Sequence, residues 1–285
     1  MNEKEIQSFW QQNPCGAQLV GDIANDGRQN YEDFFRRYDE YRYTKEPHII
    51  KNLDGIDFNG KCVLEIGLGQ GADGEQIARR GAIYSGVDLT AEAVNRTRMR
   101  FALRDLAFER IDQASALELP FDDSSFDIVF SHGVLHHIPE IGKAQAEIAR
   151  VLRPDGRLVV MLYAKWSLNY LLAISCLRRV GLLAMYSMGM KGSGIYADHL
   201  KNAREMGVGK YLAMTNFINV STDGPFNPYS KVYGTAGIVE DFKDFQLVET
   251  HKEFMHAPPL PVGRLPLAGV LGWHLWVELR TRNKD

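Results

Sequence analysis

Short apolar runs alternate with amphipathic stretches through the middle of the chain, and this alternation predicts the fold. The apolar runs predict strands at 62–66, 83–87, 108–111, 126–131 and 158–163. Helical periodicity predicts helices at 73–80, 91–103 and 141–152, and the residues at 154–156 predict a turn before the last strand. Strands that alternate with helices form a parallel sheet covered on both faces, so we expect an α/β fold.

The segments on either side of this core have patterns of their own. The first part predicts a helical cap, with a short helix at 3–11 and an aromatic stripe of Phe34, Tyr38 and Tyr41 at helical spacing. Thr235 is expected to cap a short helix that extends to 245, and two late strands are predicted at 245–249 and 273–279. We therefore expect a single domain, 1–285, whose parts are a cap at 1–58, a core at 59–164, an insert at 165–234 and a C-terminal part at 235–285.

The insert contains a long apolar segment that has two interpretations. Residues 167–190 are rich in Leu, Ala and Met, and Arg178 and Arg179 divide the segment in the middle. Two central arginines make a bilayer-spanning helix costly, at about 2.5 kcal/mol or more each. A buried or lid helix is one interpretation. A helix that rests on a membrane surface, with its arginines toward the headgroups, is the other. The glycines at 189–194 predict a flexible loop after the segment.

Composition limits the functional classes only broadly. Lys and Arg number 33 against 36 Asp and Glu, so the net charge is −3 and no global basic field favours nucleic acid. The three cysteines, at 15, 62 and 176, have no zinc spacing and favour a reducing, cytoplasmic location. The polar first residues do not resemble a signal peptide. The histidines include no pair with metal-ligand spacing, so no metal site is expected.

A glycine-rich loop after the first predicted strand is the strongest candidate for ligand binding. Glu65 ends the apolar run, Gly67, Gly69 and Gly71 follow at every second position, and Asp88 ends the next run. The first two glycines allow positive φ angles and a close ligand, and Gly71 allows the following helix to approach. The two oxygens of Asp88 can accept both hydroxyls of a ribose, so the pattern is typical of a nucleotide site.

The spacing between the end of the strand and the first glycine distinguishes two classes of nucleotide-binding protein. A dehydrogenase fingerprint would use Gly69, Gly71 and Gly74, but its first glycine should follow the strand directly, because a pyrophosphate must reach the helix N-terminus. Here Glu65 ends the strand, and its charge would repel a pyrophosphate. A ligand with a cationic amino-acid end and no phosphate, such as S-adenosylmethionine, fits better.

Five motifs, in order, resemble those of the class I S-adenosylmethionine-dependent methyltransferases of the small-molecule type. They are the glycine loop at 65–71, a ribose motif at 87–89, an adenine motif at 114–121, a fourth strand with its loop at 126–137, and a turn into the fifth strand at 151–158. The resemblance implies a Rossmann-like, doubly wound, seven-stranded sheet that is mostly parallel with a C-terminal antiparallel strand. It also implies an N-terminal helical cap and an insert after the fifth strand.

The resemblance further implies which residues bind the cofactor, S-adenosyl-L-methionine. These residues come from the motifs before the fifth strand: Glu65, Gly67, Gly69, Gly71, Asp88, Leu89, Ser115, Ala116, Ser131 and His132. Ser115 departs from the family pattern, which usually has Asp there, although a hydroxyl can still contact the edge of a base. The family's N-terminal helix lies over the cofactor, so a tyrosine of the aromatic stripe is a candidate ligand contact, with simple packing as the alternative.

Candidate catalytic residues lie just past the strand ends, where ligands bind in open α/β sheets. His136 and His137 follow the fourth strand, and Tyr163 ends the fifth. Histidine titrates near neutrality and can act as a base for an in-line methyl transfer. The alternative is that both histidines only shape the loop. The apolar insert favours a small, partly apolar acceptor over a nucleic acid.

Some choices stay open at this point. Oxygen, nitrogen and carbon acceptors share this scaffold, so the sequence does not select the acceptor atom or an oligomeric state. Two other functional classes also fit the cofactor motifs. One is a cofactor-binding but catalytically inactive partner protein, and the other is an NAD-dependent dehydrogenase.

Overall fold

Seven strands form one sheet at the centre of the molecule. The computed structural model describes residues 2–16, 20–21, 23 and 27–282, and its strands are β1 (Cys62–Ile66), β2 (Ile83–Asp88), β3 (Arg110–Gln113), β4 (Phe126–His132), β5 (Leu152–Tyr163), β6 (Phe245–Glu253) and β7 (His274–Thr281). Their order is β3-β2-β1-β4-β5-β7-β6. β1 to β5 pair in parallel, whereas β7 runs antiparallel to β5 and β6. The predicted Rossmann-like α/β sheet with a C-terminal antiparallel strand is confirmed.

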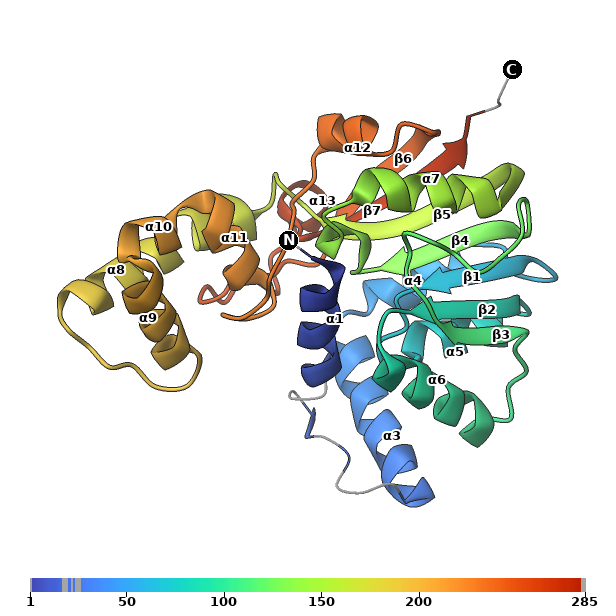
Figure 1. Ribbon diagram of the computed structural model, residues 1–285, viewed down its shortest axis with the longest axis horizontal. Helices are drawn as coiled ribbons and strands as arrows, with labels where there is room; N and C mark the ends of the chain where they lie inside the picture. The colour runs from blue at the N-terminus through green and yellow to red at the C-terminus, as the bar shows by residue number, and fades with distance from the viewer. Residues whose placement is uncertain (1, 17–19, 22, 24–26, 283–285) are drawn as a thin grey trace.

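Helices cover both faces of this sheet (Figure 1). One face carries α7 (Ile141–Val151) and α12 (Thr235–Asp241), and the other carries α4 (His48–Asp54), α5 (Ala72–Arg79) and α6 (Ala91–Leu103). Successive strand residues point to opposite faces, so Leu158 and Val160 join one core while Val159 and Met161 join the other. Both faces are buried, which explains why the strands are continuous apolar runs in the sequence.

Two N-terminal helices lie beside the carboxyl edge of the sheet (Figure 1). They are α1 (Glu3–Gln12) and α3 (Arg28–Lys45). α1 begins with a capping box, in which the Asn2 side chain accepts from the backbone N–H of Lys4 and the Glu5 side chain accepts from that of Asn2. α3 buries Phe34 and Tyr38 in a small aromatic cluster, so the aromatic stripe does pack.

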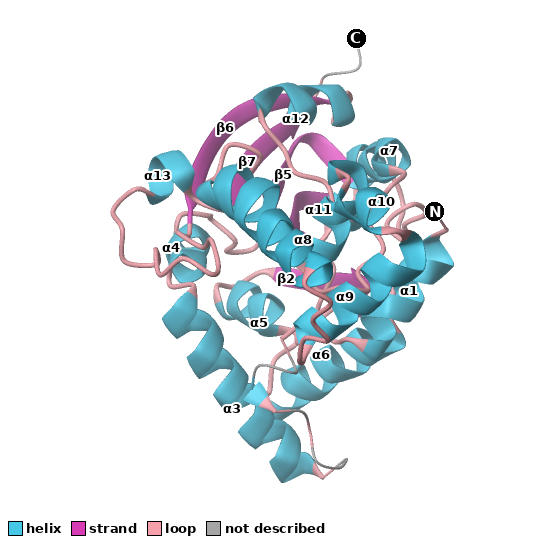
Figure 2. Cartoon of the chain, turned by 90° about the vertical axis from the view of Figure 1, so that its left-hand side faces the viewer, coloured by secondary structure: helices cyan, strands magenta, loops and turns pink. Residues whose placement is uncertain are grey.

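Residues 165–222, which we call the arm, project away from the sheet (Figures 1 and 2). The arm comprises a π-helix, η2 (Asn169–Arg178), which continues as α8 (Arg179–Ser187), and then α9 (Ile195–Met206), α10 (Val208–Leu212) and α11 (Met214–Thr222). It has a core of its own, in which Ile174, Leu182, Leu200 and Phe217 pack with Trp273. The short helices η1 (Leu135–His137) and α13 (Ala268–Leu271) complete the fold.

Two local predictions were wrong, and the buried form of the helix, one of the interpretations left open for residues 167–190, is contradicted. The residues at 154–156 form no turn before β5, because the strand runs through them from Leu152, with Asp155 at a φ of +66° and a shift in register against β4. Thr235 does not cap α12, because Gly234 is the N-cap residue and no side chain bonds there, and the helix ends at Asp241. The apolar segment is one long helix, but it is not a buried one, since only 17% of an 18-residue window within 169–187 is buried.

Candidate functional site

A cleft lies at the carboxyl ends of β1, β2 and β4. The strand order reverses between β1 and β4, and ligands of open α/β sheets bind at such a switch point. Side chains from the strand ends and from both N-terminal helices line the cleft, and they include Ile6, Trp10, Tyr38, Arg42, Glu65, Gly67, Leu68, Gly69, Asp73, Asp88, Leu89, Ala116, Leu117, His132, Val134 and His137. The sequence therefore located the cleft correctly from its strand ends and its glycine loop.

Two glycines, Gly67 in the loop and Gly74 on α5, are required by backbone conformation or by close neighbours. Gly67 has a φ of +85°, and a Cβ atom there would lie 2.2 Å from Cγ2 of Val134. A Cβ atom on Gly74 would lie 2.4 Å from the Tyr84 hydroxyl and 2.6 Å from Oε2 of Glu65. Any side chain at these positions would push the loop away from its neighbours, so glycine keeps the floor of the cleft closed and its backbone accessible.

Glu65 lies beneath the loop and is 1% exposed. The Tyr84 hydroxyl donates to its Oε2 at 2.5 Å. Burial, reinforced by the nearby charge of Asp73, raises the pKa of Glu65 well above its usual value. Glu65 thus lines the cleft and is held in place by the Tyr84 hydroxyl.

Asp88 ends β2 and organises the loop. Its Oδ2 accepts from the backbone N–H of Leu68 at 2.8 Å, and its Oδ1 accepts from the backbone and the hydroxyl of Thr90, both at 2.8 Å. Burial raises its pKa, although these hydrogen bonds oppose the shift. Carboxylate oxygens accept more than one hydrogen bond each, so Asp88 keeps capacity for a ligand's hydroxyl groups.

Three charged or titratable side chains converge at one end of the cleft. Nη2 of Arg42, from α3, lies 2.6 Å from Oδ2 of Asp73 and 2.8 Å from Nδ1 of His132. Although burial favours the neutral acid, Arg42 and His132 lower the pKa of Asp73 far below its usual value. Nε of Arg42, Oδ1 of Asp73 and Nε2 of His132 are buried and have no partner among the described residues. Sequence reasoning missed Arg42 and Asp73.

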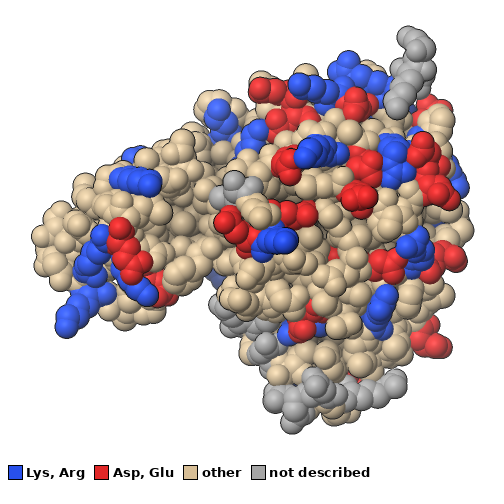
Figure 3. Space-filling view, in the orientation of Figure 1, with Lys and Arg blue, Asp and Glu red and all other residues tan. Residues whose placement is uncertain are grey.

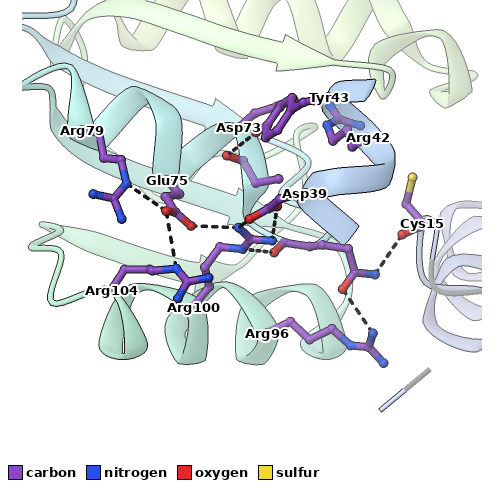
Figure 4. A network of polar contacts seen from close by, with 12 residues as sticks. Cys15, Asp39, Arg42, Tyr43, Asp73, Glu75, Arg79, Arg96, Arg100 and Arg104 are labelled. Carbon is purple, nitrogen blue, oxygen red and sulfur yellow. Dashed lines mark hydrogen bonds and ion pairs between the residues drawn. The ribbon is translucent and has the colours of Figure 1, made fainter. Parts of the chain in front are cut away.

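A network of ion pairs fixes α3 over the glycine loop (Figure 4). The guanidinium of Arg100, on α6, is 1% exposed and bonds to both oxygens of Asp39 at 2.9 Å and to Glu75 at 2.8 Å. Its Nε also donates to the backbone carbonyl of Gln70 within the loop, at 2.9 Å. One buried arginine therefore joins α3, α5, α6 and the loop, so the position of Arg42 is set by the same network that shapes the cleft.

The remaining predicted cofactor residues divide into two groups. Leu89, Ala116 and His132 line the cleft, as does Gly69. The Ser115 hydroxyl instead donates to Glu3 and accepts from the backbone N–H of Leu117 at 3.0 Å, and Ser115 is not among the lining residues. Ser131 is fully buried and donates to the Ile66 carbonyl at 2.9 Å. Ser131 joins the ends of β1 and β4, whereas Gly71, at a φ of +72°, approaches Thr97 of α6.

Of the two adjacent histidines, only His137 faces the cleft. Its Nδ1 lies 2.7 Å from the Tyr229 carbonyl oxygen and is therefore assigned a proton, because that oxygen can only accept. Its Nε2 lies 3.5 Å from Oδ2 of Asp223, and neither of these two buried atoms has a hydrogen-bond partner among the described residues. The Tyr163 hydroxyl donates to Oδ1 of Asp223 at 3.0 Å. Burial beside Asp223 raises the pKa of Tyr163 well above its usual value, so the phenol stays protonated.

His136 does not reach the cleft. It is fully buried, its ring packs against the Tyr163 ring at a tilt of 38° with the centroids 3.9 Å apart, and neither ring nitrogen has a partner among the described residues. Burial lowers its pKa well below the usual value, so the ring is neutral. The geometry opposes the prediction of His136 as a base and supports its alternative role in shaping the site. Asp223, which follows the arm, was missed by the sequence.

The comparisons with known proteins agree with this geometry. Residues 64–160 match a family model described as a methyltransferase domain. Over these residues the chain is similar to methyltransferases. Fatty-acid O-methyltransferase of Mycolicibacterium smegmatis is 40% identical over 102 residues, which are 35% of this chain and 36% of that protein. Phthiotriol/phenolphthiotriol dimycocerosates methyltransferase of Mycobacterium tuberculosis is 39% identical over 103 residues, 35% of this chain and 37% of that protein.

Solved structures extend the likeness in fold over most of the chain. The PH0226 protein from Pyrococcus horikoshii has a TM-score of 0.54 at 16% identity, covering 96% of this chain and 99% of that one. A SAM dependent methyltransferase from Aquifex aeolicus has a TM-score of 0.52 at 12% identity, covering 90% and 100%. The chain matches the curated relatives over only about a third of their own length. The family model ends at residue 160, so the arm lies outside the residues that this model matches.

A second cavity lies between the arm and the segment that precedes β7. Its walls combine arm residues with the segment before β7, and they include Asn169, Arg178, Leu182, Tyr196, His199, Phe217, His256, Pro259 and Trp273. Trp273 stacks on Tyr163 with the ring centroids 4.4 Å apart. The Tyr163 and Asp223 pair therefore lies beside the wall of this cavity and also contacts His137 of the cleft.

Metal and membrane binding can each be judged from the described residues. Within residues 2–16, 20–21, 23 and 27–282, no group of three His, Cys, Asp or Glu side chains could hold a metal ion. In the same part of the chain, one helix, Asn169–Ser187, is long and apolar enough to cross a membrane by length and composition. Some helices of proteins that do not span membranes are equally long and apolar, so the surroundings of the helix decide its role.

Proposed function

We propose that this chain binds S-adenosylmethionine in the cleft and transfers its methyl group to a small, partly apolar molecule. The observation that carries the proposal is the trio of Arg42, Asp73 and His132, whose free atoms are buried and unpartnered among the described residues. Arg42 would hold the carboxylate of a zwitterionic amino acid, and the charged Asp73 would hold its ammonium group. Burial strengthens such charge-assisted bonds, so a methionine end suits this pocket well.

The rest of the cleft suits a nucleoside. Asp88 would accept the ribose hydroxyls, and the glycine loop lets the ligand approach the backbone closely. Ile6, Ala116 and Leu117 offer apolar walls for a base. When bound, the cofactor supplies a methyl group activated by positive sulfur. The matched family and the curated relatives are methyltransferases, which argues against the dehydrogenase alternative.

We further propose that His137, Asp223 and Tyr163 handle the acceptor's proton. The lone pair of Nε2 on neutral His137 can accept a proton from an acceptor hydroxyl or amine. The nearby Asp223 carboxylate then stabilises the imidazolium that forms, and Tyr163 fixes that carboxylate through Oδ1. Each residue has one role: His137 receives the proton, Asp223 offsets the charge, and Tyr163 is a positioning residue.

An apolar acceptor is the final part of the proposal. The second cavity has walls of Leu182, Phe217, Pro259 and Trp273, and it adjoins the Tyr163 and Asp223 pair. Two relatives are named as acting on a fatty acid and on phthiotriol or phenolphthiotriol dimycocerosates, which are apolar compounds. We therefore expect a small lipid-like molecule with one nucleophilic oxygen or nitrogen, and not a nucleic acid.

Titration calorimetry tests the cofactor assignment. S-adenosylmethionine and S-adenosylhomocysteine should both bind, and Asp73→Asn should weaken both because it removes a buried charge that has no substitute. Asp122→Asn, at an exposed site, is the matched control. Binding of NADH with no binding of S-adenosylmethionine would reject the assignment.

Product formation tests the transfer. Release of S-adenosylhomocysteine is measured with a panel of fatty acids, alkyl phenols and alkyl amines. With an accepted substrate, His137→Gln should lower kcat by about 10²–10⁴-fold, with little effect on affinity for S-adenosylhomocysteine. Firm cofactor binding with no methylated product across the panel would favour the inactive-partner alternative instead.

A further inference from the structure

The long helix of the arm presents apolar side chains to solvent. Leu172 on η2, Val180 and Leu183 on α8, and Met188 directly after α8 are 37%, 61%, 45% and 68% exposed. Leu171 and Leu177 widen this stripe. We call this set of six residues the apolar face. It lies along the arm, whose end is seen in Figure 2 with α8 in front.

The fold does not account for this exposure. The opposite side of the same helix, including Ile174 and Leu182, already packs into the core of the arm. A helix that is apolar all round normally lies inside a protein or a membrane. The segment that packs against the start of η2 continues the pattern, because Leu265 and Val270 are 45% and 67% exposed. Apolar surface of this extent usually marks a binding site.

The charge of the arm indicates what binds there. Its 58 residues, 165–222, contain seven Lys and Arg against two Asp and Glu, whereas the rest of the chain contains 26 against 34. None of the seven basic side chains forms an ion pair with an acidic side chain of the part that the structure describes. In Figure 3, basic side chains lie along the edges and tip of the arm, and uncharged surface fills most of its visible face. The exposed cations include Lys191, Lys201 and Lys210.

We propose that the apolar face docks on the surface of an anionic lipid bilayer, with the helix lying in the plane of the interface. Apolar side chains flanked by unpaired cations match the two layers that a bilayer surface offers, acyl chains below and anionic headgroups above. A second protein would satisfy the apolar side chains, but it would need a matching acidic rim.

The arm's arginines show why the helix lies on the bilayer and does not cross it. Nη1 of Arg178 donates to the Ser221 carbonyl at 2.6 Å, and its Nε donates to the Pro258 carbonyl at 2.9 Å. Nε of Arg179 donates to the Leu212 carbonyl at 2.9 Å. These bonds tie the middle of the helix to the rest of the fold. A spanning helix would have to break all of them and place two charges near the bilayer centre.

Membrane docking stands independently of the proposed methyl transfer, and it also gives that proposal a route for the acceptor. The second cavity lies between the helix that bears the apolar face and Trp273, which stacks on Tyr163. An apolar molecule that leaves a bilayer under the arm would enter the cavity without crossing bulk water. The experiment below measures docking alone, so failure of either proposal leaves the other to be judged on its own test.

Sedimentation with vesicles tests the docking. The full chain is mixed with vesicles of phosphatidylcholine and phosphatidylglycerol, and in parallel with vesicles of phosphatidylcholine alone. We expect binding to the anionic vesicles that is strongly reduced on the neutral ones and reversed by high salt. Val180→Asp should abolish it, and the matched control Val239→Asp, at a 51%-exposed site on α12, should leave it unchanged.

Charge variants make the test independent of any folding defect. Lys191→Ala combined with Lys210→Ala should lower the partition coefficient roughly 25-fold, at about fivefold for each lysine near an anionic surface. Lys243→Ala, at an exposed site outside the arm, should have no effect, and circular dichroism confirms the fold of each variant. Equal binding to neutral and anionic vesicles overturns the proposal. So does release by detergent but not by salt, or a stable dimer in light scattering that Val180→Asp dissociates.

Discussion

Replacing Gly67 by Ala tests whether the floor of the cleft depends on a missing Cβ atom. The residue has a φ of +85°, which costs an L-residue about 1–2 kcal/mol. The new Cβ would lie 2.2 Å from Cγ2 and 2.8 Å from Cγ1 of Val134, so the loops after β1 and β4 must separate. Overpacking of this kind costs about 1–3 kcal/mol, which gives a total loss of about 2–5 kcal/mol in the free energy of unfolding.

Urea unfolding and calorimetry with S-adenosylhomocysteine measure the two consequences separately. Affinity should fall at least about tenfold, equivalent to about 1.4 kcal/mol, because the separated loops no longer share one floor. The double variant Gly67→Ala with Val134→Ala lacks both Cγ atoms of Val134. Its free energy of unfolding should therefore be about 1–2 kcal/mol higher than the sum of the two single effects predicts. The cost of the positive φ at residue 67 should remain in the double variant.

A glycine in an open position provides the control for this series. A Cβ atom added to Gly142, on α7, would meet nothing within 4 Å, and the residue has no positive φ. Gly142→Ala should therefore stabilise the helix by about 0.5–1 kcal/mol. If Gly67→Ala unfolds within about 0.5 kcal/mol of the wild type, or if the pair with Val134 shows no coupling, the steric account is refuted.

Four further predictions concern the ligand, acid stability, metals and the arm. Asp88→Ala should weaken binding of S-adenosylmethionine by about 1.5–3 kcal/mol, and unchanged affinity in calorimetry would sink that assignment. The charged form of Asp73 stabilises the fold above its unfolded pKa of 3.8, and this stability is lost as the pH falls toward the lower folded value, so acid unfolding should be steeper for the wild type than for Asp73→Asn. Methyl transfer should continue in the presence of a chelator, because no metal site is expected. Loss of turnover that is restored by a divalent ion would contradict this expectation. Amide hydrogen exchange should be faster at 189–194 than in β1 and β4 and should slow when acceptor binds; equal protection would mean that the arm is rigid.

The sequence predicted those parts of the fold and site that depend on local patterns. Apolar runs located most strands within a few residues, because a strand buried on both faces needs continuous apolar residues. The loop at 65–71 was located from glycine spacing alone. In contrast, Arg42 meets Asp73 across 31 positions, and Tyr163 meets Asp223 across 60, because separate elements pack on the same sheet edge. The one available signal was Asp73 itself, an acid in the first turn after the glycine loop.

The two adjacent histidines illustrate a different limit. His136 and His137 lie on the short 3₁₀ helix η1, in which successive side chains point about 120° apart. His137 therefore faces the cleft while His136 faces the Tyr163 ring. Because both residues are histidines, the sequence could not distinguish their orientations. The residue at which η1 begins decides which histidine faces the cleft. Packing of Leu135 in the core sets where η1 begins.

The helices that cover the cleft are held with unequal strength, and this asymmetry defines a route for ligand exchange. Displacing α3 would break the ion pair between Asp39 and Arg100, which is 1% exposed, and would leave Arg100 paired with Glu75 alone. This displacement would expose a buried network of charges to solvent. Displacing α1 breaks the hydrogen bonds from Gln7 to the Leu89 carbonyl and from Ser115 to Glu3, and the contact of Trp10 with His137. A ten-residue helix has little stability of its own once detached. Because α1 is held by fewer charged contacts than α3, we expect a ligand to enter and leave the cleft by displacement of α1.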